Sequence, residues 1–128
     1  MTPDLTYLVW TVALTMAQLL VVIVGAMLQV PLPVLAGNRE TAVECTGWLG
    51  RAQRAHRNML ESLALFGILV LVAHVTGQAN AMTALGAAVF FWARVAYTAV
   101  YLAGVTWVRS LLFAVSMTGL VLILLQLL

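Results

Sequence analysis

Four long hydrophobic runs follow one another along the chain. The first contains no charged residue from Leu5 to Val30, and Pro31 and Pro33 cannot continue it as a helix. About 20 apolar residues is the length of helix that crosses the hydrocarbon core of a bilayer. The pattern therefore predicts one domain, residues 1–128, made of four transmembrane helices. Their expected spans are residues 5–30, 56–75, 82–103 and 107–128.

The connections after the second and third runs are short and contain turn-forming residues. Thr76 to Asn80 (TGQAN) predicts a tight turn, and Gly104 to Thr106 predicts another short connection. We expect Thr2 to cap the first helix and Thr106 to cap the last. The second helix has a polar beginning, Arg51 to Glu61, which we expect to lie in water or among lipid headgroups. The expected fold is an all-α, integral membrane four-helix bundle that runs up-down-up-down.

Composition supports lipid as the main solvent of the outer surface. The 128 residues are 64% hydrophobic and 8% charged, whereas soluble domains are about 45–50% apolar and about 25% charged. The six basic residues are all Arg, and they form no basic stripe with interleaved aromatic residues. We therefore expect membrane lipid as a partner and no nucleic acid.

Metal and haem sites lack a plausible set of ligands. The single Cys45 excludes an internal disulfide and any multi-thiolate site, and we interpret it as structural. His56 and His74 are 18 residues apart on one helix, or about 27 Å, so they cannot ligate one haem from one chain. We predict neither a metal nor a haem.

The distribution of Arg predicts the orientation in the membrane. Arg39, Arg51, Arg54 and Arg57 lie in or just after the first connection, and Arg109 follows the third. The N-terminal segment and the second connection contain no Lys or Arg. The positive-inside rule then places the first and third connections in the cytoplasm and both termini on the other side.

Two helices each present a polar stripe near this cytoplasmic end. At 100° per residue, one stripe on the second helix falls within about 80°: Arg51, Arg54, Asn58 and Glu61. A second stripe on the third helix falls within about 60°: Arg94, Tyr97 and Tyr101. These residues could be ion pairs and hydrogen bonds that hold helices together, or Arg side chains that reach the headgroups. The Arg residues outnumber nearby carboxylates, however, and such a surplus indicates an anionic ligand.

The segment RAQRAHRNMLE, Arg51 to Glu61, followed by Leu65-Phe66, resembles the signature of the MAPEG family, the membrane-associated proteins of eicosanoid and glutathione metabolism. This family includes microsomal glutathione transferases. The stretch ARVAYTAVY, Ala93 to Tyr101, and Arg109 at the start of the last helix resemble two further blocks of the family. The resemblance covers about Arg51 to Leu112 in order. One departure is Ser62, where members that bind glutathione often have an aromatic residue.

The resemblance implies a homotrimer that binds glutathione as co-substrate between neighbouring subunits, at the cytoplasmic face. By motif, the residues implied to bind glutathione are Arg51, Arg54, Asn58, Glu61, Arg94, Tyr97 and Tyr101. Arg109 matches the catalytic Arg proposed to stabilise the thiolate of glutathione. This role agrees with elementary chemistry, because a nearby guanidinium lowers the pKa of a thiol from about 8.5 and so raises the thiolate fraction.

The expected function is that of a membrane-embedded, glutathione-dependent transferase or peroxidase acting on a lipophilic electrophile. We expect a bacterial member in the inner membrane, with its site facing the cytoplasm. Two alternatives stay open. One is a non-catalytic lipid-binding or scaffold protein of the same fold. The other is a small cation/proton antiporter that would depend on Glu61, although this carboxyl lies near the cytoplasmic end among Arg residues.

Overall fold

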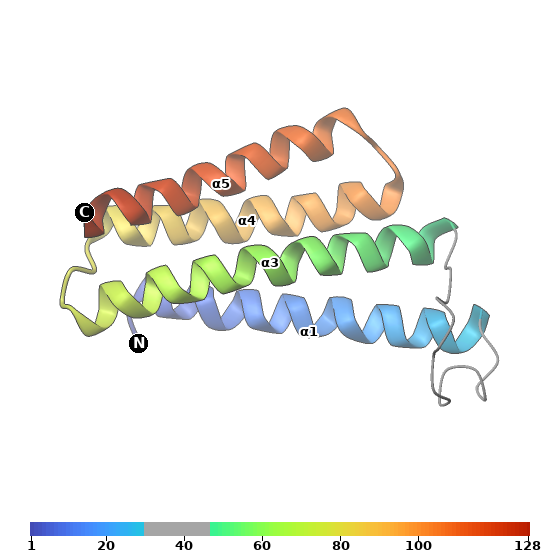
Figure 1. Cartoon of the computed structure of the whole chain (residues 1–128), viewed down its shortest axis with the longest axis horizontal. Helices are drawn as coiled ribbons and strands as arrows, with labels where there is room; N and C mark the ends of the chain where they lie inside the picture. Colours follow the sequence, from blue (N-terminus) through green and yellow to red (C-terminus); the bar gives the residue numbers. More distant parts are fainter. Residues whose placement is uncertain (30–46) are drawn as a thin grey trace.

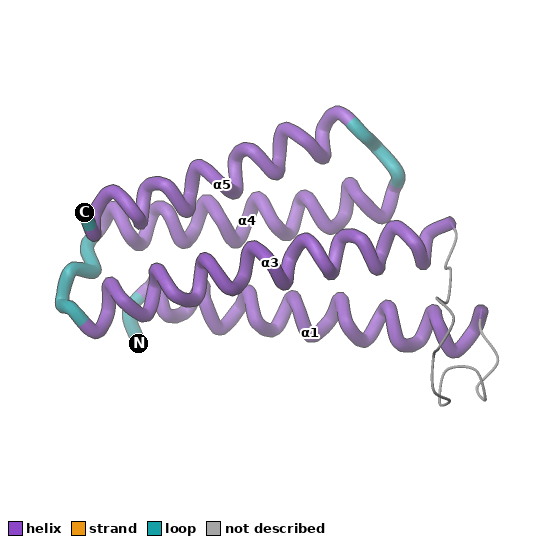
Figure 2. The backbone as a smooth tube through the Cα atoms, in the orientation of Figure 1, coloured by secondary structure: helices purple, strands orange, loops and turns teal. Residues whose placement is uncertain are grey.

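The computed structural model describes residues 1–29 and 47–128, which form four helices. They are α1 (Pro3–Gln29), α3 (Gly47–Val75), α4 (Ala81–Ala103) and α5 (Trp107–Leu127). Successive helices run in opposite directions, and the two ends of the chain lie at the same end of the bundle (Figure 1). Short connections join α3 to α4 and α4 to α5 (Figure 2). The predictions for Pro31, Pro33, Arg39 and Cys45 lie outside the described residues.

All four helices are long and apolar enough to cross a membrane, so the fold is an all-α bundle of membrane-spanning length. The helix α3 already begins at Gly47, before the polar segment that starts at Arg51. Its first turn packs against α1, because Leu49 is fully buried and the ring of Trp48 lies beside Gly25. Tertiary packing therefore extends this helix beyond its hydrophobic run.

The predicted turns form, and two helix ends have well-defined caps. Asn80 accepts hydrogen bonds from the backbone of Met82 and Thr83, and the Thr83 hydroxyl accepts one from the Asn80 backbone, which is a capping box. At the other end of α4, Gly104 adopts a φ of 83°, which glycine tolerates without strain. Its N–H donates to Tyr101, and the next N–H, of Val105, donates to Val100. This is a Schellman motif.

Thr106 occupies the N-cap position of α5 as predicted, and Thr2 directly precedes α1, but neither side chain caps its helix among the described residues. Thr106 precedes α5 but has helical backbone angles, and within the described chain its side chain makes no capping hydrogen bond. A residue with such angles does not aim its side chain at the free N–H groups of the first turn. The carbonyl of Thr2 accepts the first α1 bond, from Thr6, but the Thr2 hydroxyl has no partner among the described residues.

The buried residues of the apolar core come from α3, α4 and α5, and partly buried residues of α1, among them Leu5 and Leu8, pack against them. At its centre Phe66 and Phe90 stack with ring centroids 4.3 Å apart. Around this pair the buried cluster consists of Met59, Val70, Ala87, Leu120 and Ile123. The core therefore fills the half of the bundle that is distant from the Arg residues at the beginning of α3.

The buried side of α1 is polar rather than apolar. Thr11, Thr15 and Gln18 are buried on it, at a spacing that places them on one face of the helix. The two threonine hydroxyls donate to the carbonyls one turn earlier, at 2.7 and 2.8 Å. The hydrophobic residues of α1 instead lie mostly on the exposed side. This inversion is what a lipid environment favours, because polar groups there need partners inside the protein.

The backbones of α4 and α5 meet at Gly86 and Gly119. A Cβ atom at Gly86 would lie 2.6 Å from the Gly119 carbonyl oxygen, and one at Gly119 would lie 2.6 Å from the Gly86 carbonyl oxygen. Small residues at such contacts let helices pack closely in membranes. Gly67, by contrast, has only a leucine methyl at 3.8 Å from a would-be Cβ. The close-approach interpretation therefore holds for Gly86 and Gly119 but not for Gly67.

We predict that Gly119→Ala lowers the free energy of unfolding by about 1–3 kcal/mol, because the new methyl group forces the two backbones apart. Gly67→Ala is the matched control, since it adds the same methyl group in open space and favours the helical conformation. Unfolding by increasing denaturing detergent, followed by circular dichroism, gives the comparison. Equal stability of the two variants would contradict the close contact.

Candidate functional site

A polar cavity lies between α3, α4 and α5. Its volume is about 280 Å³. Its lining residues are Asn58, Tyr97, Tyr101, Arg109, Ser110 and Phe113. Four of the eight residues predicted from the sequence thus border one space, although they come from three helices.

Two arginine residues pack over the two tyrosine rings. The guanidinium carbon of Arg94 lies 4.2 Å from the centre of the Tyr97 ring, and that of Arg109 lies 4.8 Å from the centre of the Tyr101 ring. The ring centroids of Tyr97 and Tyr101 are 5.5 Å apart. Cation–π contacts of this kind are stronger where water is excluded. They fix the orientation of both rings at the wall of the cavity.

Arg54 contacts the hydroxyl end of Tyr101. Its Nε atom donates a hydrogen bond to the Tyr101 hydroxyl at 3.2 Å, while the Arg54 residue as a whole is exposed. A tyrosine hydroxyl that accepts from a guanidinium still has its own proton to donate. Tyr101 can therefore donate a hydrogen bond to an anionic ligand.

Arg109 lies in the first turn of α5, where a cation is unfavourable. The free N–H groups there give the helix end a partial positive charge, which normally attracts acidic residues. This turn contains no acidic residue. The side chain of Thr106, as described above, also fails to cap it within the described structure. The positive end of α5 and the Arg109 guanidinium therefore repel each other. An anion bound between them would relieve this repulsion, so this position favours anion binding.

Arg51 has a structural partner at the end of α4. Its Nε atom donates to the carbonyl oxygen of Leu102 at 3.1 Å, and its side chain lies against Gly104. Arg side chains commonly bond the last carbonyls of a helix, where the helix dipole also favours a cation. The structure thus places Arg51 at the α4–α5 turn, next to the cavity rather than in its wall.

Arg94 and Glu61 do not line the cavity. Arg94 is buried, whereas Glu61 is exposed. Arg94 is fully buried behind the Tyr97 ring, and its three guanidinium nitrogens have no hydrogen-bond partner among the described residues. Glu61 is exposed on the outer side of α3. No ion pair forms between any two described residues. The cationic charge of this end of the bundle is therefore not neutralised by carboxylates within the described part of one subunit.

Ser110 and Phe113 border the cavity but were missed in the sequence. Ser110 follows Arg109 directly, and Phe113 lies one helical turn after it. The spacing of Arg109 and Phe113, at i and i+4, would have placed them on one face of the helix. Asn58 offers an acceptor in the same wall, because its Oδ1 atom has no partner within the described residues.

Metal chemistry gains no support from the side chains. Across residues 1–29 and 47–128, no three His, Cys, Asp or Glu side chains are close enough together to hold a metal ion. The described cavity wall contains one guanidinium, three hydroxyl groups, one amide and the Phe113 ring.

The chain is similar in sequence to a known protein family over nearly its whole length. Among curated proteins, no sequence matches the chain. A model of the MAPEG family matches residues 5–128, which is nearly the whole chain. The match includes all of the cavity residues. It also includes nearly all of α1, a helix that contains none of the motifs found in the sequence. With its four membrane-spanning helices and its matching sequence, this chain belongs to the MAPEG family.

Proposed function

We propose that the chain is a membrane-embedded, glutathione-dependent transferase or peroxidase that acts on a lipophilic electrophile. The observation that carries the proposal is the position of Arg109. It brings together a guanidinium over the Tyr101 ring, a helix beginning with no side-chain cap among the described residues, and a polar cavity. Each of the three favours an anion, and a thiolate is the anion that the family's chemistry requires.

The polar groups around the cavity match those of glutathione, which has two carboxylates and one ammonium. Arg54 and the Tyr101 hydroxyl can bind one carboxylate, and the Asn58 amide can bind a peptide group. Glu61 is the acid available for the ammonium. Arg94 and Arg51 add positive charge behind this wall, which strengthens the binding of a ligand with net negative charge.

The chemical step needs a thiolate close to Arg109. The thiol releases its proton to water, and the guanidinium stabilises the charge that remains on sulfur. In the transferase reaction, sulfur then forms a bond to the electrophilic carbon, and the leaving group departs with the bonding electron pair. With a hydroperoxide, the substrate is reduced to an alcohol and water is released, while two glutathione molecules are oxidised to the disulfide.

A homotrimer would complete this site. The cavity in one subunit, about 280 Å³, is below the usual range of about 300–1,000 Å³ for small-molecule sites. Arg54 and Glu61 are both exposed on α3. A neighbouring subunit placed against this surface would cover the ligand and bring further groups to it. Glutathione would then be bound between subunits.

The orientation follows from the Arg residues. Arg51, Arg54 and Arg109 all lie at the end of the bundle opposite the two termini of the chain (Figure 1). The positive-inside rule assigns this end to the cytoplasm. In a bacterial cell the protein would lie in the inner membrane, where its site would meet the cytoplasmic pool of glutathione.

Of the two alternative functions, the antiporter that would depend on Glu61 has the less structural support. Exchange of cations for protons needs a carboxylate inside the bundle, and Glu61 is exposed on the outer side of α3. A non-catalytic binding protein could use the same cavity. Turnover by the purified chain distinguishes it from the enzyme.

We predict that Arg109→Ala lowers the kcat for conjugation of 1-chloro-2,4-dinitrobenzene by roughly 10²-fold at pH 7, because the thiolate loses its stabilising charge. The deficit should shrink as the pH rises towards 9, since a free thiol with a pKa of about 8.5 then ionises without help. Absorbance of the conjugate, followed over this pH range, gives the profile. Arg57→Ala is the control, because this exposed Arg does not border the cavity. Undiminished activity of Arg109→Ala at pH 7 would refute the role of Arg109.

We predict that the purified protein is a trimer. Native mass spectrometry in a mild detergent should give a mass of three chains of 13.8 kDa, because each ligand would need contacts from two subunits. Activity should fall on dilution below the concentration at which the trimer dissociates. A monomer that retains full activity would exclude a site between subunits.

We predict that the α3–α4 turn faces outward and the α4–α5 turn faces the cytoplasm. In a Cys45→Ser background, a membrane-impermeant maleimide should label Gln78→Cys in intact cells. It should label Val105→Cys only after the membrane is permeabilised, because this turn lies at the Arg-rich end. The opposite pattern would reverse the proposed orientation.

A further inference from the structure

Phe113 is the one residue in the described wall of the polar cavity that has no polar side chain. Each of the other described lining residues carries a hydroxyl, an amide or a guanidinium group. Phe113 is 37% exposed, so a ligand in the cavity can contact it. The cavity thus offers one accessible hydrocarbon surface among polar groups.

Phe113 also lies close to the position where the thiolate would be stabilised. It follows Arg109 by four residues on α5, so the two side chains share one face of the helix, about 6 Å apart along its axis. Arg109 is in the first turn of this membrane-spanning helix, and Phe113 is one turn further into the bilayer. A reacting carbon must come within about 3–3.5 Å of the sulfur. An electrophile that arrives from the lipid therefore meets a sulfur at Arg109 while its apolar part lies against Phe113.

The two tyrosine rings of the wall are less available to a ligand than the ring of Phe113. Both tyrosines are buried, and each ring has a guanidinium group over it, as described above. The ring of Phe113 touches only the edge of this group: its centroid lies 6.5 Å from that of Tyr97, and the ring planes make an angle of 51°. Aromatic pairs form offset-stacked or edge-to-face contacts with centroids about 4.5–7 Å apart. A ligand ring can form such a contact with the exposed part of Phe113.

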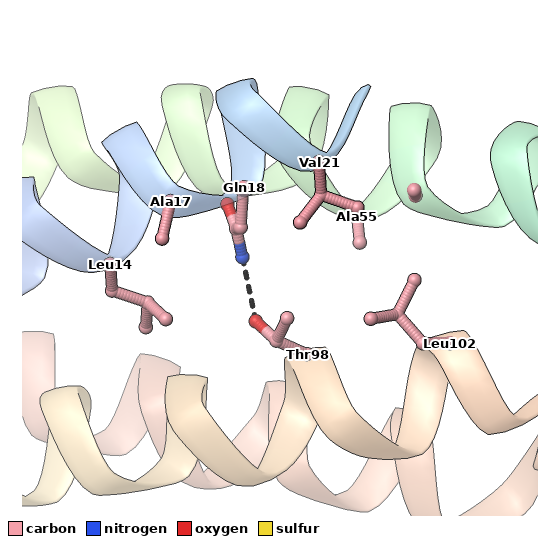
Figure 3. Close-up of a pocket in the computed structure, with 8 residues that line it drawn as sticks. Leu14, Ala17, Gln18, Val21, Ala55, Thr98 and Leu102 are labelled. Carbon is pink, nitrogen blue, oxygen red and sulfur yellow. Dashed lines mark hydrogen bonds between the residues drawn. The ribbon is translucent and has the colours of Figure 1, made fainter. Parts of the chain in front are cut away.

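A second, smaller cavity gives an electrophile no contact with this site. It has a volume of about 110 Å³ and lies between α1, α3 and α4, where the Gln18 Nε2 atom donates to the Thr98 hydroxyl at 2.6 Å (Figure 3). It shares no lining residue with the polar cavity. Ala55, which lines it, packs against the tyrosine rings of the polar cavity, so these rings lie between the two spaces. The electrophile therefore reaches the polar cavity from the side of α5.

We propose that Phe113 makes the site selective for electrophiles that carry an aromatic ring, an inference that rests on the proposed function. The substrate ring packs against Phe113 while the sulfur lies at Arg109. In the reaction a carbon–sulfur bond forms, the leaving group departs with the bonding electron pair, and the thiol proton goes to water. Contact between two aromatic rings strengthens binding beyond what their buried area contributes. Phe113 thus determines specificity, whereas Arg109 serves the chemical step.

The test is a competition between two electrophiles of nearly equal size, phenethyl iodide and 2-cyclohexylethyl iodide. Both have the same primary carbon–iodine group, and they differ in whether the ring is aromatic. Equal amounts react with glutathione and the full chain in detergent micelles, and mass spectrometry quantifies the two conjugates. The reaction in micelles without protein is subtracted, and the partitioning of each iodide is measured. The product ratio reports the ratio of the two kcat/KM values, so it does not depend on how much of a variant is folded.

Phe113→Leu should lower the ratio of aromatic to aliphatic product roughly two- to tenfold, because leucine keeps an apolar surface but has no ring. Phe113→Trp should preserve the preference. Trp92→Leu is the matched control, since it removes an exposed aromatic ring outside the cavity lining, and it should leave the ratio unchanged. An equal ratio in the unchanged chain and in Phe113→Leu, with turnover intact, would overturn the inference and leave the proposed function standing. If neither conjugate exceeds the protein-free reaction, the proposed function fails and the inference fails with it.

Discussion

Within a bilayer a polar group can find a hydrogen-bond partner only inside the protein, and this constraint organises the whole bundle. It accounts for α1, whose Thr11, Thr15 and Gln18 lie inward while most of its leucines and valines lie outward. It also accounts for the ends of α4, which are closed by Asn80 and by a Schellman motif supplemented with Arg51. Where the constraint is not met, as at Arg94, Gln18 Oε1 and the first turn of α5, the unmet groups lie beside cavities or behind their walls.

The polar cavity exists because α4 and α5 diverge. They touch at Gly86 and Gly119, near the end of the bundle that holds the termini, and they separate towards the α4–α5 turn (Figure 1). Large side chains fill the widening space: first Phe90, then Tyr97 with Arg94 behind it, and finally Tyr101 with Arg109. The apolar core is thus at the narrow end and the polar cavity at the wide end.

The number of helices, their turns and the face of α3 that carries polar residues could be predicted from the sequence, because each depends on local spacing. The motifs also grouped Asn58, Tyr97, Tyr101 and Arg109, which border one cavity in the structure. Other features could not be predicted, since they depend on contacts between helices. Arg51 bonds a carbonyl 51 positions away, and Gln18 bonds Thr98 across 80 positions. The start of α3 at Gly47 depends on packing against Gly25. The inward face of α1 was not predicted, although the spacing of four and three residues between Thr11, Thr15 and Gln18 would have placed them on one side of the helix.

The contact of Gly86 with Gly119 is the point about which α5 can tilt relative to α4. Arg109 lies ten residues before Gly119 on α5, which makes a lever arm of about 15 Å at 1.5 Å per residue. A tilt of α5 by roughly 5° about this point would move the helix at Arg109 by about 1.3 Å, and displacements near 1 Å can change a reaction rate about 10²-fold. A larger residue at Gly86 or Gly119 can therefore shift Arg109 at the opposite end of the bundle, without any change to a residue that lines the polar cavity.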